Sequence, residues 1–195
     1  MIFDLSTLIW AAAAIATLSI HEYAHSWAAT KLGDPTPRLS GRLTLDPRAH
    51  TDPLGILFLL LFGFGWGKPV PVNPANFSDP QKDMALTALA GPASNFFLAT
   101  VLALLVRVFG NLSLVLLPVI ILNLNWGFFN ILPLAPLDGS RLVSGILPPL
   151  LANQWKKLRA YSPLLLLILF LPLGKQPLLE RILSPLLSFA LQLLL

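Results

Sequence analysis

Three long apolar runs constrain this chain more than any other feature of its sequence. They are Leu5–Thr30, Met84–Phe109 and Leu112–Leu132. A helix needs about 20 mostly apolar residues to cross the roughly 30 Å hydrocarbon core of a bilayer, and each run meets that length. The chain is 55% apolar and only 11% charged, whereas soluble globular domains are about 25% charged. The runs therefore predict membrane-spanning helices and exclude an ordinary soluble globule.

The segments between and after these runs are shorter or more polar. Residues 31–53 are rich in Gly and Pro, and the alternation at Gly41–Asp46 predicts a short β-strand. The apolar run Leu54–Gly65 is too short to span a bilayer, which favours a re-entrant or interfacial element. Tyr161–Leu173 and Ile182–Leu195 are apolar but short, and they predict a tilted terminal hairpin.

Together these segments predict an all-α polytopic membrane protein with about 4–6 membrane segments. A small re-entrant or β-like element is expected on the cytosolic side. We expect one membrane-embedded domain over residues 1–195, with a core at about 5–145 and a C-terminal helical hairpin at about 146–195.

The distribution of basic residues predicts how the chain sits in the membrane. The chain has 13 Lys and Arg residues, and most of them fall in 31–83 and 139–160. These are Lys31, Arg38, Arg42, Arg48, Lys68, Lys82, Arg141, Lys156, Lys157 and Arg159. The positive-inside rule places this face in the cytosol. We therefore expect a multi-pass protein, and the compact chain favours a bacterial plasma membrane.

The net charge of +4 is small and scattered, which argues against a nucleic-acid partner.

Polar residues interrupt the first apolar run at His21, Glu22 and His25. Residues i and i+4 share a face of a helix, so both imidazoles can reach one metal ion while Glu22 projects beside it. This is the HExxH arrangement of zinc proteases. A carboxylate in mid-span costs about 2.5–3.5 kcal/mol, and a divalent cation offsets that cost. The alternative is a polar trio that bonds between helices or lines an ion pathway.

A third ligand is needed, because catalytic zinc takes three protein ligands and keeps a fourth position open. The chain has no cysteine, which leaves His50 and the carboxylates. Asp138 follows a membrane helix that Pro133 and Pro136 unwind near the cytosolic face, so it can match the depth of His25. An ordinary helix N-cap is the alternative for Asp138. His50 is interpreted as a surface or loop-ordering histidine.

Three stretches, in order along the chain, resemble the site-2 protease family of zinc intramembrane metalloproteases. They are HExxH at 21–25, Gly-Pro-Ala-Ser-Asn at 91–95 and Asn-x-x-Pro-x-x-x-x-Asp-Gly at 130–139. Residues 65–74 also resemble the loop of the short family members, which lack a PDZ or other accessory domain. The resemblance covers about residues 15–145 of the sequence.

The resemblance implies one zinc ion per chain, bound by His21, His25 and Asp138, with Glu22 as the general base. Bound zinc lowers the pKa of its water and polarises the scissile carbonyl. Two histidines and a carboxylate also suit non-haem iron, but Glu22 and its helix favour zinc.

The resemblance also implies that Asn95 and Asn130 support the substrate backbone or the oxyanion. Hydrogen bonding between helices is an equally good interpretation of both amides. A substrate must present an extended strand, because a helix hides its amides. Leu43–Leu45 or Val70–Val72 could pair with that strand by β-augmentation.

The predicted function is that of a zinc-dependent endopeptidase that cuts within or near the transmembrane segment of a membrane-protein substrate. Its expected partners are that substrate and the lipid bilayer. The alternatives are a divalent-metal transporter or channel, with Glu22 and its neighbouring histidines along the ion path, and a catalytically silent scaffold that binds substrates. Intact ligands and an intact Glu22 argue against the scaffold.

Overall fold

The structure, a computed structural model, describes residues 5–62, 65–172, 174 and 176–195, and its regular structure is helical. Its elements are α1 (Leu5–Lys31), α2 (Thr36–Leu39), α3 (Pro47–His50), α4 (Pro53–Phe62), η1 (Pro74–Asn76), α5 (Pro80–Val108), η2 (Gly110–Leu112), α6 (Ser113–Ile131), α7 (Asp138–Ile146), α8 (Pro149–Leu158), η3 (Arg159–Tyr161), α9 (Ser162–Phe170) and α10 (Leu178–Leu194). The predicted all-α class is confirmed for this part of the chain.

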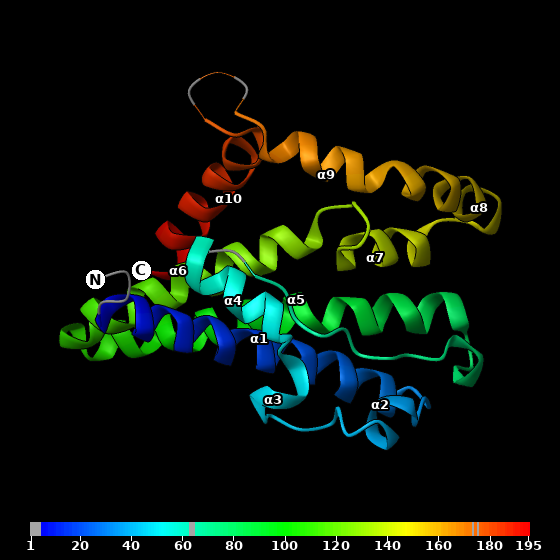
Figure 1. Cartoon of the computed structure of the whole chain (residues 1–195), viewed down its shortest axis with the longest axis horizontal. Helices are drawn as coiled ribbons and strands as arrows, with labels where there is room; N and C mark the ends of the chain where they lie inside the picture. The colour runs from blue at the N-terminus through cyan, green and yellow to red at the C-terminus, as the bar shows by residue number, and fades with distance from the viewer. Residues whose placement is uncertain (1–4, 63–64, 173, 175) are drawn as a thin grey trace.

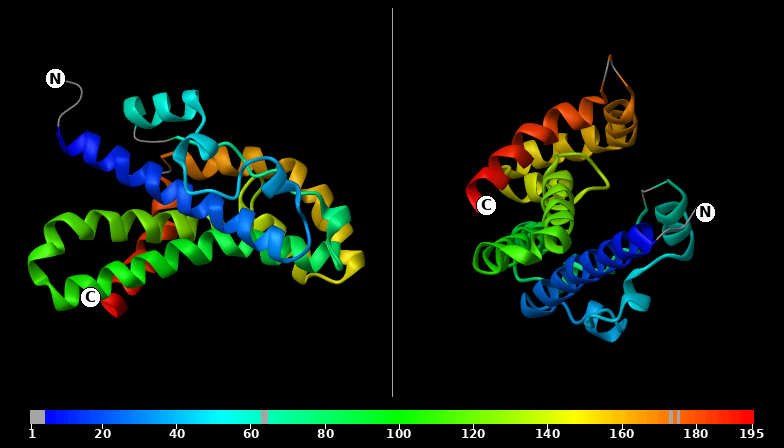
Figure 2. Two further views of the ribbon diagram at one scale, coloured as in Figure 1. Left: turned by 90° about the horizontal axis from the view of Figure 1, so that it is seen from below. Right: turned by 90° about the vertical axis from the view of Figure 1, so that its left-hand side faces the viewer.

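Helix α5 is the centre of the fold, because it packs against α1, α6 and α7. In Figure 1 these long helices run along the length of the molecule, and Figure 2 shows α1 lying across the α5–α6 hairpin. The buried core between α5 and α6 contains Ala99, Ala103, Ile120 and Leu124. Small side chains on α5 let the helix backbones approach closely, as is typical of packing inside membranes.

Local sequence signals explain where the central helices begin and end. Asp79 accepts a hydrogen bond from the Lys82 backbone N–H, and Pro80 occupies the first turn of α5. Helix α1 ends in a turn in which Gly33 has φ 109° and the Asp34 N–H donates to the Ala29 carbonyl. This geometry is a glycine C-cap, which turns the chain sharply after α1.

Among the residues that the structure describes, two helices, Pro80–Val108 and Gly110–Ile131, are long and apolar enough to cross a membrane, which is fewer than the predicted four to six segments. Helix α1, with 27 residues, is long enough but is not one of these two helices. The other apolar helices are too short to cross a membrane, since α4 has 10 residues, α9 has 9 and α10 has 17. The two predicted runs at 84–109 and 112–132 form the expected antiparallel hairpin.

The predicted strand at Gly41–Asp46 is wrong, because the described residues contain no strand and only isolated β-bridges such as Thr51 to Gly67. Side chains satisfy this loop instead. The Arg42 guanidinium donates to the carbonyls of Ala49 and Lys68, and the His50 ring bonds the Thr44 carbonyl. The Thr44 carbonyl therefore has a hydrogen-bond partner without a neighbouring strand.

The apolar run at 54–65 contains the short helix α4, which touches the rest of the fold mainly at α1. Leu54, Leu57, Phe58 and Leu61 on α4 are exposed, and Figure 2 shows this helix standing apart from the others. At the other end of the chain, α9 and α10 contact each other and meet at an angle in Figure 1, and α10 also packs against α6.

Candidate metal centre

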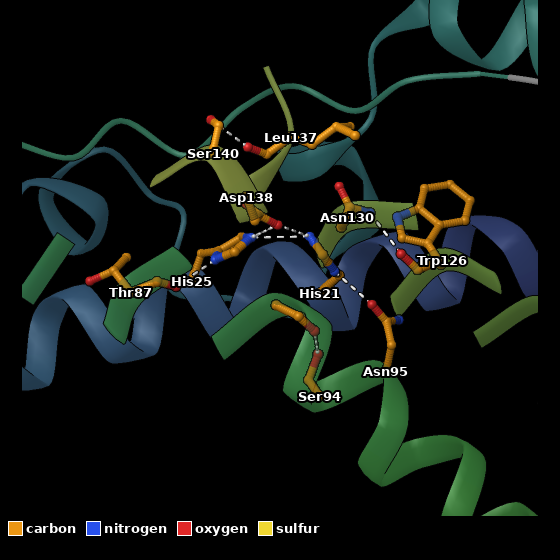
Figure 3. A network of polar contacts seen from close by, with 11 residues as sticks. His21, His25, Thr87, Ser94, Asn95, Trp126, Asn130, Leu137, Asp138 and Ser140 are labelled. Carbon is orange, nitrogen blue, oxygen red and sulfur yellow. Dashed lines mark hydrogen bonds and ion pairs between the residues drawn. The ribbon is translucent and has the colours of Figure 1, made fainter. Parts of the chain in front are cut away.

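Three side chains from two distant parts of the chain converge at one point. His21 Nε2 and His25 Nε2 lie 3.0 Å apart, and each lies 3.2 Å from Asp138 Oδ2. All three residues are buried, and no other set of described residues brings three such ligand atoms together. Figure 3 shows the carboxylate facing the two imidazoles from the opposite side.

The partners of the two imidazoles determine which ring nitrogens are free. His21 Nδ1 donates to Asn95 Oδ1 and His25 Nδ1 donates to the Thr87 carbonyl, both at 2.7 Å. Since both partners accept, each Nδ1 carries a proton, and each ring turns its Nε2 atom toward Asp138. Metal-binding histidines are typically oriented in this way.

This arrangement fits a zinc ion. Two Nε2 lone pairs and a carboxylate oxygen repel one another at about 3 Å unless a cation lies between them. Asp138 Oδ2 is also buried without a hydrogen bond. Nitrogen and oxygen ligands from two histidines and one carboxylate are a common catalytic zinc set, and they leave a fourth position open.

Helix α5 is shaped to admit the imidazoles. A Cβ at Gly91 would overlap both His21 and His25, so glycine is required at this point of α5. Pro92 follows inside α5. Because proline has no N–H, the carbonyl four residues earlier, which is next to Thr87 in the sequence, lacks its usual helical donor. The Gly-Pro pair at 91–92 thus makes room for the rings next to the carbonyl that binds His25.

Asp138 is held by a break between two helices. Helix α6 ends at Ile131 and α7 begins at Asp138, as the prolines in the intervening segment predict. The N-cap position is Leu137, so Asp138 does not act as the N-cap. A Cβ at Gly139 would overlap the Ile131 carbonyl, which explains why glycine follows Asp138.

Asn95 occupies a different position from Asn130. Asn95 is fully buried, and its Nδ2 donates to Asn123 Oδ1 at 3.1 Å. Asn123 Nδ2 in turn donates to the Thr17 hydroxyl at 3.1 Å. Asn95 therefore links α1, α5 and α6 and orients His21, whereas Asn130 bonds only the Trp126 carbonyl within its own helix.

A cavity of about 460 Å³ opens beside the metal ligands. The polar side chains of its wall are those of His21, Glu22, Asn125 and Asn130. Most of the remaining lining is apolar: Trp10, Leu18, Leu59, Trp66, Leu122, Trp126, Phe129, Leu137, Leu166, Phe170, Leu179 and Leu183. A mostly apolar lining with a few polar groups is typical of a ligand-binding cavity.

Sequence reasoning missed several residues at this centre. Asn123 is one of them, because it continues the polar chain that begins at His21 and Asn95. Asn125 lines the cavity from α6, five residues before Asn130, and Leu183 reaches the same cavity from α10. The packing of several helices brings these residues to the centre, and no spacing within one helix indicates that packing.

His50 lies away from the metal ligands. It is fully buried in α3, its Nε2 bonds the Thr44 carbonyl at 2.7 Å, and its own carbonyl accepts from the Lys68 N–H. It is therefore a buried histidine that orders the loop rather than a surface residue.

The chain is similar to proteins named as zinc metalloproteases. It is 38% identical over 173 residues to "Putative zinc metalloprotease YwhC" of Bacillus subtilis, covering 82% of this chain and 79% of that protein. It is 31% identical over 168 residues to "Putative zinc metalloprotease Rip2" of Mycobacterium tuberculosis, covering 80% of this chain and 64% of the relative. No family model and no solved structure matches the chain.

Proposed function

Because the chain belongs to the site-2 protease family of zinc metalloproteases, we propose that it cuts a peptide bond within or near the transmembrane segment of a membrane-protein substrate. Zinc is its cofactor. The observation that carries the proposal is the convergence of His21, His25 and Asp138 beside an apolar cavity that Glu22 also lines.

The exposed surface of the long helices supports an active site within the membrane. Phe97, Leu104 and Val108 on α5 and Leu114 on α6 are large, apolar and exposed. A soluble protein rarely exposes so much contiguous apolar surface. In the proposed setting, lipid covers these side chains. The metal ligands then lie between helices that are surrounded by lipid.

The residues of the site divide the chemistry among them. Zinc supplies Lewis-acid activation of a water molecule and of the peptide carbonyl when it is bound. The Glu22 carboxylate takes the proton from the attacking water and delivers it to the leaving amine. The Asn130 amide, which faces the cavity, stabilises the charge that develops on the carbonyl oxygen.

An extended segment beside the cavity is suited to hold an unwound substrate. Gly67 pairs with Thr51 and the Lys68 N–H bonds the His50 carbonyl, which fixes the start of this segment. No backbone hydrogen bond from Val70 or Val72 occurs within the described residues. Their peptide groups are thus available to replace the hydrogen bonds that a substrate helix loses on unwinding.

The test compares the wild type with Glu22→Gln, purified in detergent, on a panel of single-pass membrane substrates. We expect cleavage by the wild type alone and about one zinc per chain in both proteins, since Glu22 moves protons and is not a metal ligand. Zinc in both proteins with no cleavage by either would overturn the protease. Metal flux into vesicles reconstituted with the purified proteins, if it survives Glu22→Gln, would instead favour the transporter.

A further inference from the structure

The segment from residue 139 to residue 179 carries basic residues and no carboxylate. Arg141 lies on α7, Lys156 and Lys157 lie in the last turn of α8, and Arg159 begins η3. None of these four side chains forms an ion pair with a carboxylate in the described part of the chain. We call them the α7–α8 basic cluster.

The positive charges of the α7–α8 basic cluster are not balanced by carboxylates of the described residues. Partial burial and the nearby Arg141 guanidinium both lower the pKa of Arg159, so two cations lie close together there without an acidic partner. Like charges at short range repel unless an anion lies between them. The cluster thus provides the charge complement of a phosphate group.

Large apolar side chains surround the basic cluster. Ile146 and Leu150 are each 73% exposed, and Leu158 and Tyr161 are also exposed. Helix α8 has 10 residues, which is too short to span a bilayer. A short helix with exposed leucines and terminal lysines is typical of a segment that lies in the headgroup region of a membrane.

The position of α8 in the fold agrees with this placement. In Figure 1, α8 lies at the end of the molecule where α5 begins, opposite the end where α1 starts. Lys31 ends α1 and Lys82 lies in the first turn of α5, so basic residues gather at the end that contains the cluster. Anionic lipids attract such residues within a Debye length of the surface.

A hydrogen bond connects α8 to the metal centre. Trp155 Nε1 of α8 donates to the Ser140 carbonyl at 3.0 Å, and Ser140 is fully buried two residues after Asp138. The Gly139 backbone is packed directly against the Ile131 carbonyl, which leaves little slack between Ser140 and Asp138. A displacement of α8 would therefore be transmitted to a metal ligand.

We propose that the α7–α8 basic cluster binds the headgroups of anionic phospholipids, and that this contact seats α8 and, through Trp155 and Ser140, steadies Asp138 at the metal centre. The proposal rests on the membrane setting of the proposed function. It adds a lipid-binding site, distinct from the substrate cavity, that regulates how firmly the ligand set is held.

The first test measures the affinity of the detergent-solubilised full chain for phosphatidylglycerol by native mass spectrometry. Lys156→Gln combined with Lys157→Gln should weaken phosphatidylglycerol binding roughly tenfold or more, because each basic residue that is removed reduces the attraction to an anionic headgroup. The matched control combines Arg38→Gln on α2 with Arg48→Gln on α3, two exposed cations outside the cluster, and should bind like the wild type. Equal affinity of all three proteins would overturn the lipid site.

The second test measures the rate of zinc release to a chelator from the full chain in nanodiscs. The wild type should release zinc several-fold more slowly when phosphatidylglycerol is mixed with phosphatidylcholine than in phosphatidylcholine alone. Trp155→Phe, which removes the N–H donor and keeps an aromatic ring, should abolish this difference. Identical release from the wild type in both lipids would overturn the coupling. Neither readout depends on peptide cleavage, so the lipid site and the proposed protease activity can fail separately.

Discussion

At the scale of single residues, the chain of amides behind His21 makes the metal centre rigid. His21 Nδ1, Asn95, Asn123 and the Thr17 hydroxyl form one continuous series of hydrogen bonds through three helices. Asn95 and Asn123 are fully buried. A buried polar network of this kind specifies one arrangement, because any unpaired member would be costly in an apolar interior.

Asn95→Ala should weaken zinc binding about 10- to 100-fold, because His21 loses the acceptor that fixes its ring orientation. Zinc affinity is measured by competition with a chelator. Ser94→Ala is the control, since the Ser94 hydroxyl bonds only the Gly91 carbonyl within its own helix. If Asn95→Ala binds zinc like Ser94→Ala, then Asn95 does not orient His21.

Asp34 gives a residue-scale prediction of pH dependence outside the membrane helices. Burial raises its pKa, but hydrogen bonds from the Thr36 hydroxyl and N–H, the Asn76 amide and the Asn73 N–H lower the pKa below the ordinary carboxyl value. The folded pKa is depressed, so the stabilisation is present above an unfolded pKa of about 3.9 and is lost as the pH falls through the folded pKa.

Asp34→Asn should therefore lower the free energy of unfolding at pH 7 by about 1–3 kcal/mol, since donors that met a carboxylate would face an amide. The difference from the wild type should shrink below pH 4. Denaturant unfolding in detergent across this pH range measures both effects. Asp46→Asn, which breaks an exposed pair with Arg48, should cost much less; a pH-independent loss for Asp34→Asn would contradict the argument.

Much of the candidate metal centre follows from local spacing. His21 and His25 share a helix face by geometry alone, and the prolines before Asp138 predict a helix break at that point. The partners of Asn95 could not be predicted in this way. They depend on which faces of three helices meet, and the sequence of one helix does not determine that packing.

At the scale of secondary-structure elements, length and capping signals were more reliable than alternation. The α5–α6 hairpin follows from two long apolar runs with a short link. The alternating residues 41–46 predicted a strand, but a strand needs a partner for its backbone groups. Arg42 and His50 bond the loop carbonyls instead, and a tertiary interaction of that kind leaves no periodic signal.

Proline at Val70 or Val72 tests the role of the extended segment. Either Val70→Pro or Val72→Pro removes a backbone N–H that no described residue uses, so zinc binding should stay the same. Cleavage should fall about tenfold or more if a substrate strand pairs there. Val70→Ala and Val72→Ala, which keep the N–H, are the controls. Equal loss of zinc binding and cleavage would count against strand pairing and point to a folding defect.

At the scale of the whole molecule, the C-terminal helices contribute more than their sequence suggests. The family motifs end near residue 139, and the residues after about 145 carry no diagnostic pattern. Leu166 and Phe170 of α9 and Leu179 and Leu183 of α10 nevertheless form one wall of the cavity beside Glu22. Leucine-rich helices resemble one another, so a sequence does not indicate which cavity they line.

Leu179→Trp tests whether this cavity receives the substrate. The larger ring would fill part of the roughly 460 Å³ volume without touching the metal ligands, which lie on α1 and α7. We expect kcat/KM to fall about tenfold or more, because small misplacements of a substrate at the reacting centre are costly. Zinc content and unfolding midpoint should match those of the wild type.

Leu186→Trp is the control, since Leu186 lies on the same helix, is 42% exposed and does not line the cavity. Undiminished cleavage by Leu179→Trp would show that substrates reach Glu22 by another path and that α10 only covers the core.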